Sequence, residues 1–577
     1  MAQKRPFNEG KRHFKKNKKQ KSSTGVSEGS NEEVLLADVR RLLQDVKIAN
    51  GSTMQEEAER VLPEQWTEID LDITEISSTG DGLAQKDGHA YVVPFTAPGD
   101  TVTAKVVRHV LENSYTLTDF LAVKTPSQHR TGTPPCPYFS QCSGCQFQHL
   151  PYSYQLAHKR RIVEKAYANF SGLPAAAVPA VGETIGSPLQ YGYRTKLTPH
   201  FDGPPMARKD RRAGVKATWP GVPPIGFMKK GTRKTMDIED CPIGTEAVRL
   251  GMRRERKRVS EEIEKYQRGA TLLLRESTER VAKEGGVEVV ESGKVEGEDV
   301  VVEARGEFVH RKTCITDSKA TSTEYVDEFR FDNPAGSFFQ NNNSVLPLVT
   351  QYIRDNILAP PTPDDSTGTQ SQPKITKMID AYCGSGFFTV ALSQTFTNSI
   401  GIDISPQSIT SATHNAELNN LPSNSTTFIP SDANALFAAI DTAKFPPAET
   451  VVVIDPPRKG CDRGFIRQLL EYGPARICYV SCNVHTQARD VGWLVKGLEA
   501  EGVGGGEEEG AMEGLYEIES LRGFDFFPQT GHVEGVAVLR RKGGVGSVKE
   551  EATTAGEVRA VAPPVHGNEA AAAEETS

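Results

Sequence analysis

The sequence has 577 residues, enough for about three or four domains, and a formal net charge of −8 that is spread unevenly along the chain. No stretch reaches the roughly 18 consecutive apolar residues of a membrane span, and no signal-peptide core follows the first residues. Nine cysteines, a sparse and odd count, are typical of a reducing compartment, where thiols react or bind metals. We therefore expect an intracellular monomer, in the nucleus, the cytoplasm or the mitochondrion, that does not contact a membrane.

The first 62 residues predict a tail followed by a helix. Residues 1–31 are expected to be disordered, and residues 1–25 carry nine Lys/Arg against the single Glu9. Such an arm suits nucleic-acid contact or nuclear import, and equally a solvated tail. Residues 32–62 predict a helical lead-in, because their apolar residues recur on one helical face. We expect that face to pack on a neighbour.

In residues 63–126 the apolar residues recur at every second position and no longer at helical spacing. Apolar and polar residues alternate from about residue 67, with Gly and Asp turns at short intervals, which predicts a small antiparallel barrel of the oligonucleotide-binding kind. The stretch resembles a TRAM domain, on residues that occur in the expected order: Gly80, Gly82, Ala84, Gly88, Val93-Pro94 and Pro98-Gly99. The resemblance implies an RNA-binding module, although barrels of this size also serve as plain scaffolds.

Four cysteines form a possible metal centre. Cys136, Cys142 and Cys145 fall within ten residues of a loop rich in Pro and Gly, and Cys241 offers a fourth thiol further along. Four thiolates suit a [4Fe-4S] cluster or a structural zinc ion, and their spacing alone leaves both open. The spacing C-x5-C-x2-C differs from the C-x3-C-x2-C pattern of radical enzymes, so we expect no radical chemistry.

Residues 127–330 predict a central domain of mixed β structure that contains the most basic folded part of the chain. Residues 151–241 hold fifteen Lys/Arg against seven Asp/Glu, with aromatic residues between them. Cations for phosphates and rings for bases are the usual means of binding single-stranded or looped RNA. We predict RNA contacts by Tyr193, Arg194 and Lys196; a solvated charged face is the alternative.

Residues 331–541 predict a Rossmann-like domain. The run TKMIDAYCGSGFFTVALS has the pattern of a strand, a glycine-rich turn at Gly384 and a helix, and the next strand ends at Asp403. Glycines let the backbone approach a ligand, and such an acid accepts hydrogen bonds from ribose hydroxyls. The complete Asp-Ala-Tyr-Cys-Gly-Ser-Gly turn and a later acid, Asp432, placed to meet an adenine amino group, favour S-adenosylmethionine over a dinucleotide.

Two β-branched runs, at 451–454 and 477–480, flank a helical segment, as in a parallel sheet buried on both faces. The first run ends at Asp455 and the second at Cys482. Ligands bind at the carboxyl ends of such strands, so a carboxylate and a thiol are expected to share one crevice. A buried core residue is the alternative for Cys482, but its polar neighbours at a strand end favour chemistry.

Taken together, these motifs resemble the RNA uracil-C5 methyltransferases, and most of all their eukaryotic tRNA (uracil-5-)-methyltransferase branch. The resemblance covers about residues 67–541 and implies that Cys482 is the nucleophile, Glu534 the general base and Asp455 their support. It also implies a [4Fe-4S] cluster on the four cysteines. The methyl donor would be lined by Gln340, Tyr382, Asp403 and Asp455, beside Gly384 and Asp432. Phe387 stands where some relatives carry Asn. Outside the pattern lie the insertions at 360–374 and 501–511 and the tail 542–577, which we expect to be disordered.

The chemistry suits these residues. Uracil C5 is too weak a nucleophile to attack a sulfonium, but a thiolate that adds to C6 makes C5 enolate-like. C5 then takes the methyl group, and a base removes the C5 proton so that the cysteine is eliminated. We therefore predict S-adenosylmethionine-dependent formation of 5-methyluridine in tRNA, at T-loop position 54, on a base flipped out of the RNA. The alternatives are a ribosomal-RNA uracil methyltransferase and an RNA-binding or folding protein whose methylation is incidental.

Overall fold

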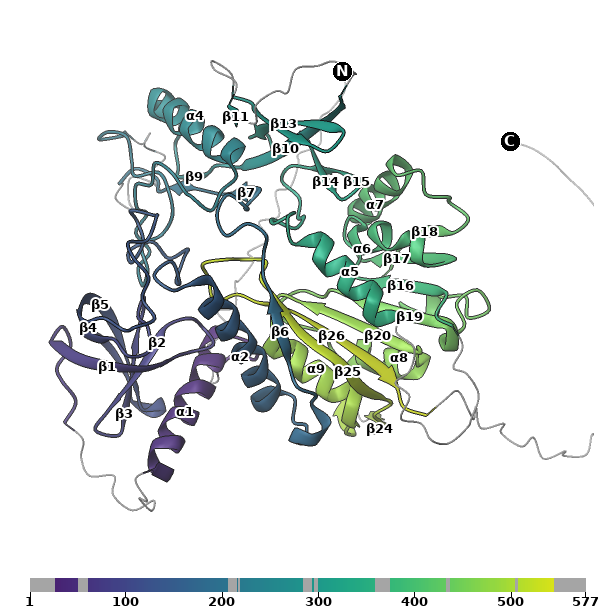
Figure 1. The fold of residues 1–577 in the computed structure, drawn as a ribbon, viewed down its shortest axis with the longest axis horizontal. Coiled ribbons are helices and arrows are strands. Elements are labelled where there is room, and N and C mark those ends of the chain that lie inside the picture. The colour runs from purple at the N-terminus through teal and green to yellow at the C-terminus, as the bar shows by residue number, and fades with distance from the viewer. Residues whose placement is uncertain are drawn as a thin grey trace, which may run out of the picture. The chain divides into compact units, whose positions relative to one another are not determined.

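The computed structural model describes residues 26–49, 61–205, 215, 218–283, 293–294, 299–358, 374–431, 436–503 and 507–543 (Figure 1). The predictions for the basic arm up to residue 25, for Asp432 and for the tail beyond residue 543 lie outside these residues. None of the helices within these ranges is long and apolar enough to cross a membrane.

The alternating stretch folds as a closed five-stranded barrel, as its sequence predicts. Its strands are β1 (Glu68–Ile76), β2 (Gly82–Lys86), β3 (His89–Val93), β4 (Thr101–Val110) and β5 (Tyr115–Thr125). Their order around the barrel is β1-β2-β3-β5-β4, and only β3 and β5 pair in parallel. Alternate side chains such as Leu71, Ile73 and Val102 fill the interior, which explains the period of two.

Helix α1 (Asn31–Ala49) is the helical lead-in that the sequence predicts, and it packs on this barrel. Its apolar face, which includes Leu36 and Val39, shares a core with Leu83 and Tyr115 of the barrel. The expectation that this face packs on a neighbour is confirmed. Burial of this stripe explains why a helix this close to the end of the described chain is ordered.

The Rossmann-like part is built on one eight-stranded sheet. Its strands are β6 (Gly182–Ile185), β16 (Lys377–Ala381), β17 (Asn398–Asp403), β18 (Thr426–Pro430), β19 (Thr450–Ile454), β20 (Arg476–Ser481), β25 (Tyr516–Phe524) and β26 (Glu534–Arg541). The order is β18-β17-β16-β19-β20-β26-β25-β6. The first five strands are parallel, and β26 runs antiparallel to both of its neighbours. From β16 the chain adds β17 and β18 on one side and then β19 and β20 on the other. A ligand crevice is expected where this order switches, at the carboxyl ends of β16 and β19.

Helices cover both faces of this sheet (Figure 1). One face is covered by α2 (Tyr152–Phe170), α8 (Arg463–Tyr472) and α9 (Val484–Lys496), and the other by α5 (Leu346–Ile357), α6 (Phe387–Ala391) and α7 (Pro406–Leu418). In β20, Ile477 and Tyr479 belong to the first core, whereas Cys478 and Val480 belong to the second. Burial on both sides is why these strands are continuous apolar runs.

The structure differs from the predicted domain boundaries at residues 152–185. The sequence assigned them to the central domain, but α2 packs on α9 and β6 pairs in parallel with β25. The Nζ atom of Lys159 on α2 also lies 2.5 Å from Oδ1 of Asp525, and neither side chain of this pair is exposed. A four-residue strand shows too little periodicity to be assigned to a sheet from sequence.

The central region is of mixed β structure, as expected. A five-stranded sheet has the order β11-β12-β13-β10-β7, and α4 packs on β10 and β13. The bounds are β7 (Lys196–Leu197), α4 (Glu246–Glu262), β10 (Leu274–Ala282), β11 (Gly293–Lys294), β12 (Val301–Arg305) and β13 (Phe308–Ile315). Short antiparallel pairs are β8 (His200–Phe201) with β9 (Ala270–Thr271), β14 (Thr321–Val326) with β15 (Phe329–Pro334), β21 (Gly497–Leu498) with β24 (Met512–Glu513), and β22 (Glu501–Val503) with β23 (Glu507–Glu509).

Candidate active site

Two antiparallel strands bring Cys482 and Glu534 side by side. β20 ends at Ser481, β26 begins at Glu534, and the register pairs Ser481 with Gly535. One step further along this ladder, Cys482 stands opposite Glu534. Opposed residues of such a ladder have Cα atoms about 4.5–5.5 Å apart. The predicted nucleophile and the predicted base, far apart in the sequence, therefore lie at one edge of the sheet.

Asp455 joins this edge from the neighbouring strand. It follows β19 directly, and its backbone N–H donates to the carbonyl oxygen of Ala381, at the end of β16, over 3.4 Å. The parallel register of β19 and β20 pairs Ile454 with Tyr479. The predicted crevice is therefore present, with a carboxylate and a thiol at adjacent strand ends.

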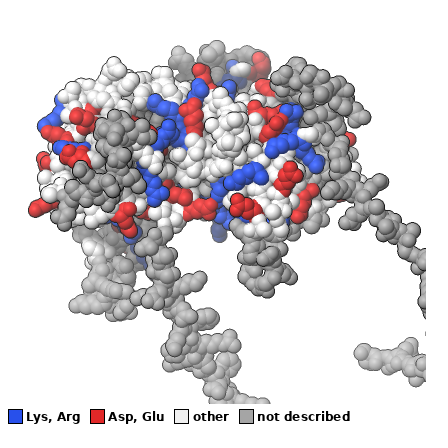
Figure 2. Space-filling model, turned by 90° about the horizontal axis from the view of Figure 1, so that it is seen from below, with Lys and Arg blue, Asp and Glu red and all other residues white. Residues whose placement is uncertain are grey.

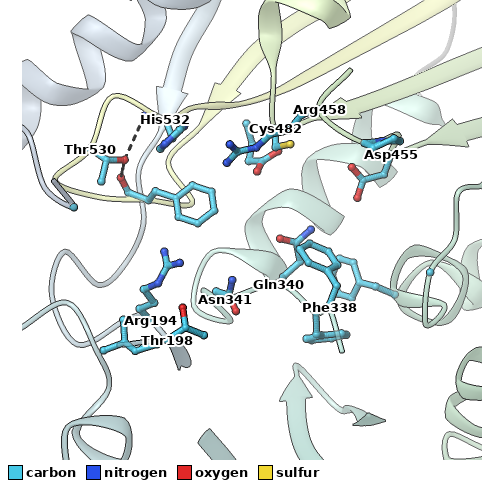
Figure 3. Close-up of a pocket in the computed structure, with 18 of the residues that line it drawn as sticks. Arg194, Thr198, Phe338, Gln340, Asn341, Asp455, Arg458, Cys482, Thr530 and His532 are labelled. Atoms are coloured by element: carbon cyan, nitrogen blue, oxygen red, sulfur yellow. Dashed lines mark hydrogen bonds between the residues drawn. The ribbon is translucent and has the colours of Figure 1, made fainter. Parts of the chain in front are cut away.

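These residues line one large cavity of about 1200 Å³, which also reaches the glycine-rich turn and the four-cysteine loop. Figure 3 shows Arg458, Cys482 and His532 along one side of this cavity, and Arg194, Asn341 and Phe338 along the other. Its walls come from the large sheet, the central region and the loop that precedes β26. A donor and a separate acceptor molecule can therefore meet at Cys482.

The pKa values of the Glu534 and Asp455 carboxyl groups both lie close to neutral pH. Burial, and then the charge of Asp455, raise the pKa of Glu534 to about 8, while Arg458 opposes the rise. Burial, and then the charge of Asp380, raise the pKa of Asp455 to about 7. A general base is most effective when its pKa lies near the working pH, so Glu534 has the proton affinity that its predicted role requires.

The thiol of Cys482 is a neutral group in this environment. Burial, followed by the charges of Glu534 and Asp455, raises its pKa to about 12. Arg458 acts in the opposite direction, through its charge and through a hydrogen bond to the sulfur. The thiolate is the reactive form of cysteine. Arg458 therefore favours the attack of Cys482, because it lowers the pKa of this thiol.

Sequence reasoning gave no role to Arg458 or to His532, although both line the cavity. Arg458 completes the Asp-Pro-Pro-Arg segment after β19, and a cation so close to a predicted strand-end site was an available signal. His532 lies two residues before Glu534 and is exposed toward the cavity; partial loss of hydration there, followed by the charge of Arg458, lowers its pKa. A neutral ring is favoured, and one ring nitrogen can then accept a hydrogen bond.

The glycine-rich turn after β16 leaves room for a ligand. Tyr382 and Gly384 have φ of 64° and 55°, and a Cβ atom added at Gly384 would meet nothing within 4 Å. The N–H of Gly384 donates to Oδ2 of Asp403 over 3.1 Å, and the N–H of Ser405 donates to Oδ1 over 2.8 Å. Each carboxylate oxygen keeps a further lone pair, so Asp403 can still accept ribose hydroxyl groups.

Further side chains complete this part of the cavity. The predicted donor contacts Gln340, Tyr382 and Asp403 all line it. Phe338 and Ile404 line it too and are 74% and 67% exposed, which is unusual for large apolar residues. Sequence reasoning missed both; the position of Ile404 directly after the strand-end acid was the available signal. Phe387, at the position where some relatives carry Asn, is buried and packs against three other rings: Phe331, Phe339 and Phe388.

The four predicted metal ligands, Cys136, Cys142, Cys145 and Cys241, all line this cavity as free thiols. Burial raises the pKa of each, to about 12 for Cys145; the charges of neighbouring cysteines add to the rise for Cys142, Cys145 and Cys241, and that of Asp240 does so for Cys136. In the described part of the chain, no group of three or more His, Cys, Asp or Glu has the arrangement needed to hold a metal ion. The structure thus gathers the four thiols without showing the predicted metal centre.

The three predicted RNA contacts have different surroundings. Tyr193 is 2% exposed and its hydroxyl donates to the carbonyl of Pro528 over 3.1 Å, so its ring has no free face for a base. Nζ of Lys196 donates to the carbonyl of Ser337 over 2.9 Å. Arg194 lines the cavity, with its guanidinium 5.6 Å from the ring centre of Phe527. On the face seen in Figure 2, Lys and Arg are interspersed with Asp and Glu.

The fold and the site together define a Rossmann-like methyltransferase with a thiol and a carboxyl group beside its donor pocket. The family model for tRNA (Uracil-5-)-methyltransferase matches residues 366–503. The chain is 42% identical over 526 residues to the tRNA (uracil(54)-C(5))-methyltransferase of Schizosaccharomyces pombe, covering 91% of this chain and 86% of the relative. It belongs to the tRNA (uracil-5-)-methyltransferase family.

Two further comparisons agree with this. The tRNA (uracil(54)-C(5))-methyltransferase of Saccharomyces cerevisiae is 38% identical over 550 residues, which cover 89% of this chain and 79% of that protein. Among solved structures, the tRNA (uracil-54, C5)-methyltransferase of Pyrococcus abyssi in complex with S-adenosyl-L-homocysteine has a TM-score of 0.53 and 22% identity. That match covers 82% of this chain and 100% of the archaeal chain, and it shows a shared fold.

Proposed function

We propose that this protein methylates C5 of uridine 54 in tRNA, with S-adenosylmethionine as the methyl donor. The observation that carries the proposal is the position of Cys482 and Glu534 directly beyond the Ser481–Gly535 pair of β20 and β26, in the cavity that contains the glycine-rich turn. A nucleophile, a base and a donor pocket are the three parts that the reaction needs. Support for tRNA and for position 54 comes from the two yeast relatives, which are named for that activity.

The roles of the residues follow from the order of bond changes. The sulfur of Cys482 forms a bond to C6 as its proton passes to the carboxylate of Asp455, and the electrons of the C5–C6 double bond move toward C5 and O4. S-adenosylmethionine supplies an electrophilic methyl group to C5 and leaves as S-adenosylhomocysteine. Glu534 then takes the C5 proton, the double bond re-forms, and the bond from sulfur to C6 breaks. Arg458 stabilises the thiolate at the first and the last of these steps, because its charge favours that form.

A uracil inside folded RNA has to leave its stack to reach Cys482. Phe338 offers an exposed ring in the same cavity, and stacking on an aromatic face is worth about 1–3 kcal/mol per base. Arg194 offers a cation there for a phosphate or a carbonyl oxygen. These two residues therefore replace Tyr193 as the proposed contacts for the flipped nucleotide.

We also infer that Cys136, Cys142, Cys145 and Cys241 hold a [4Fe-4S] cluster. The donor set supports this: four free cysteines line the same cavity, and the N–H of Gly144 donates to Sγ of Cys142 over 3.4 Å. Nearby backbone N–H groups also favour the thiolate of Cys136 and of Cys241. Such hydrogen bonds to sulfur are typical of iron–sulfur sites. Protein purified without oxygen should contain iron and sulfide at about four each per chain; stoichiometric zinc without sulfide would overturn this.

The proposed reaction is tested with purified protein, S-adenosylmethionine and unmodified tRNA transcripts. We expect one methyl group per tRNA, found as 5-methyluridine at position 54, and none on a transcript with cytidine at that position. Cys482→Ala should abolish methyl transfer. Methylation of ribosomal RNA but not of tRNA would overturn the substrate, and RNA annealing without methyl transfer by the wild type would overturn the reaction.

A further inference from the structure

Residues 28–30, which lead into α1, lie against the loop that carries Cys482. The carbonyl oxygen of Gly29 accepts a hydrogen bond from Nδ2 of Asn483 over 3.2 Å. Glu28 forms an ion pair with Arg489 on α9, with 3.0 Å between Oε1 and Nη1. A second cavity, of about 610 Å³, is lined by Gly29 and also by Cys482. The beginning of the described chain therefore forms part of the nucleophile's surroundings.

The conformation of this segment is fixed locally. The N–H of Glu33 donates to Oγ of Ser30 over 3.2 Å, and the N–H of Gly29 donates to Oε2 of Glu33 over 2.6 Å. This pattern differs from a capping box in that Glu33 accepts from Gly29 and not from Ser30, but it likewise holds the entry of the chain into α1. Gly29 has φ of 69°, and a Cβ atom there would lie 2.6 Å from Cγ2 of Thr486. Glycine therefore permits both the turn and the close approach to α9.

Asn483 connects this segment to the site. It is bonded directly to Cys482, and its Nδ2 donates both to Gly29 and to the carbonyl oxygen of Arg458, the latter over 2.9 Å. Its Oδ1 accepts from the N–H of His485 over 3.2 Å and so caps α9. One amide group therefore holds together the residues before α1, the loop after β19 and the first turn of α9.

At its other contacts, α1 is fixed to the barrel and to α2. Asp38 accepts a hydrogen bond from the N–H of Ser78, in the loop after β1, over 2.5 Å. Lys165 on α2 lies 3.2 Å from Asp38 and 3.0 Å from Glu75 on β1. Together with the apolar contact to the barrel, these bonds connect the barrel, through α1, to the loop that carries Cys482.

We propose that residues 28–30 position Cys482, so that α1 couples the barrel to the nucleophile; this rests on the proposed function. The segment acts through Asn483 and does not touch the reacting atoms. A displacement of about 1 Å at a reacting group can lower a rate by up to a hundredfold. Loosening the segment should therefore slow the attack of Cys482 while leaving the affinity for tRNA unchanged.

The test uses tRNA with 5-fluorouridine at position 54, which cannot lose a C5 proton and so traps the protein as a denaturant-resistant adduct. At saturating tRNA and S-adenosylmethionine, Gly29→Ala should form this adduct about ten- to a hundredfold more slowly than the wild type. Its Kd for tRNA should stay close to wild type, because the segment contributes little to tRNA binding. Its melting temperature should fall by only a few degrees, because alanine at a φ of 69° is strained.

A second substitution provides the rescue. Thr486→Ser removes Cγ2, the atom that an alanine at position 29 would strike, and keeps the hydroxyl that donates to the carbonyl of Arg458 over 3.1 Å. The double variant should recover the part of the lost rate that this clash causes, when compared with Thr486→Ser alone; the strain of alanine at a φ of 69° remains. Asp45→Ala, which removes a carboxylate from the exposed side of the same helix, should form the adduct at the wild-type rate.

The outcomes separate this inference from the proposed function. If the wild type forms the adduct and Gly29→Ala forms it equally fast, the positioning role is wrong and the proposed function stands. A slow Gly29→Ala variant that melts far below wild type and is not rescued at all by Thr486→Ser would show a purely structural segment, and would overturn the inference as well. If the wild type forms no adduct, the proposed function itself fails.

Discussion

Glu534→Gln should raise the free energy of unfolding, by an amount that depends on pH, although it impairs catalysis. The glutamate is 4% exposed, and burial raises its pKa from 4.5 to about 8. The folded protein therefore retains a proton that the unfolded chain releases above pH 4.5, and stability falls as pH rises from 4.5 to 8. Glutamine has nearly the same shape and carries no proton to lose, so this dependence should disappear in the variant.

The magnitude follows from the two pKa values. The free energy of unfolding of the wild type should be lower than that of the variant by about 1 kcal/mol at pH 5, about 3 kcal/mol at pH 7 and about 5 kcal/mol at pH 9. Above pH 8 the difference should level off, because both states then release the proton. In melting temperature this corresponds to an advantage for Glu534→Gln on the order of 10 °C at pH 9 and about 2 °C at pH 5.

The measurement is a series of thermal melts of wild type and Glu534→Gln from pH 5 to pH 9, in the absence of tRNA and donor. Glu261→Gln, at an exposed position on α4, controls for the loss of one carboxylate. An advantage of equal size at every pH would show that Glu534 is not held protonated in the folded protein. Destabilisation of the variant at pH 9 would contradict the assignment of burial as the cause of the raised pKa.

Three further predictions concern catalysis and binding. Glu534→Gln should add to tRNA and methylate it but eliminate very slowly, so that methylated RNA accumulates as a denaturant-resistant adduct on gels, whereas Cys482→Ala should form no adduct. Arg458→Ala removes the cation that lowers the pKa values of Glu534 and Cys482, so the rate of methyl transfer should need a higher pH to reach its plateau, seen in a pH–rate profile. Arg194→Ala should weaken tRNA binding and reduce the salt slope by about one unit, whereas Lys196→Ala, which loses bonds to backbone carbonyls, should leave that slope unchanged.

The sequence predicted those parts of the site that depend on local patterns. Continuous apolar runs that end at Asp455 and Cys482 predicted a sheet edge, and the glycine-rich turn with Asp403 predicted the donor pocket. Each of these signals lies within a short stretch of the chain, because a buried parallel strand and the turn after it are local features. The alternating stretch predicted the barrel for the same reason.

Contacts between distant segments could not be predicted in this way. The assignment of α2 and β6 to the large sheet depends on packing that a four-residue strand does not reveal. Tyr193 lies in a basic stretch, yet burial against Pro528 removes its ring from the surface. The approach of Gly29 to Asn483 spans most of the chain, and a single glycine in a polar segment gives no signal of it.

The same geometry explains why the insertion near residues 501–511 is compatible with the site. Cys482 and Glu534 are separated by a helix, short strand pairs and a complete strand, β25, but their distance is set by the hydrogen bonds between β20 and β26. Those bonds pair six consecutive residues of each strand, from Arg476 with Arg540 to Ser481 with Gly535. A change in the length of the intervening loop leaves this register intact, whereas a slip of one residue would turn Glu534 to the opposite face of the sheet. The ladder, and not the length of the connection, therefore fixes the spacing of nucleophile and base.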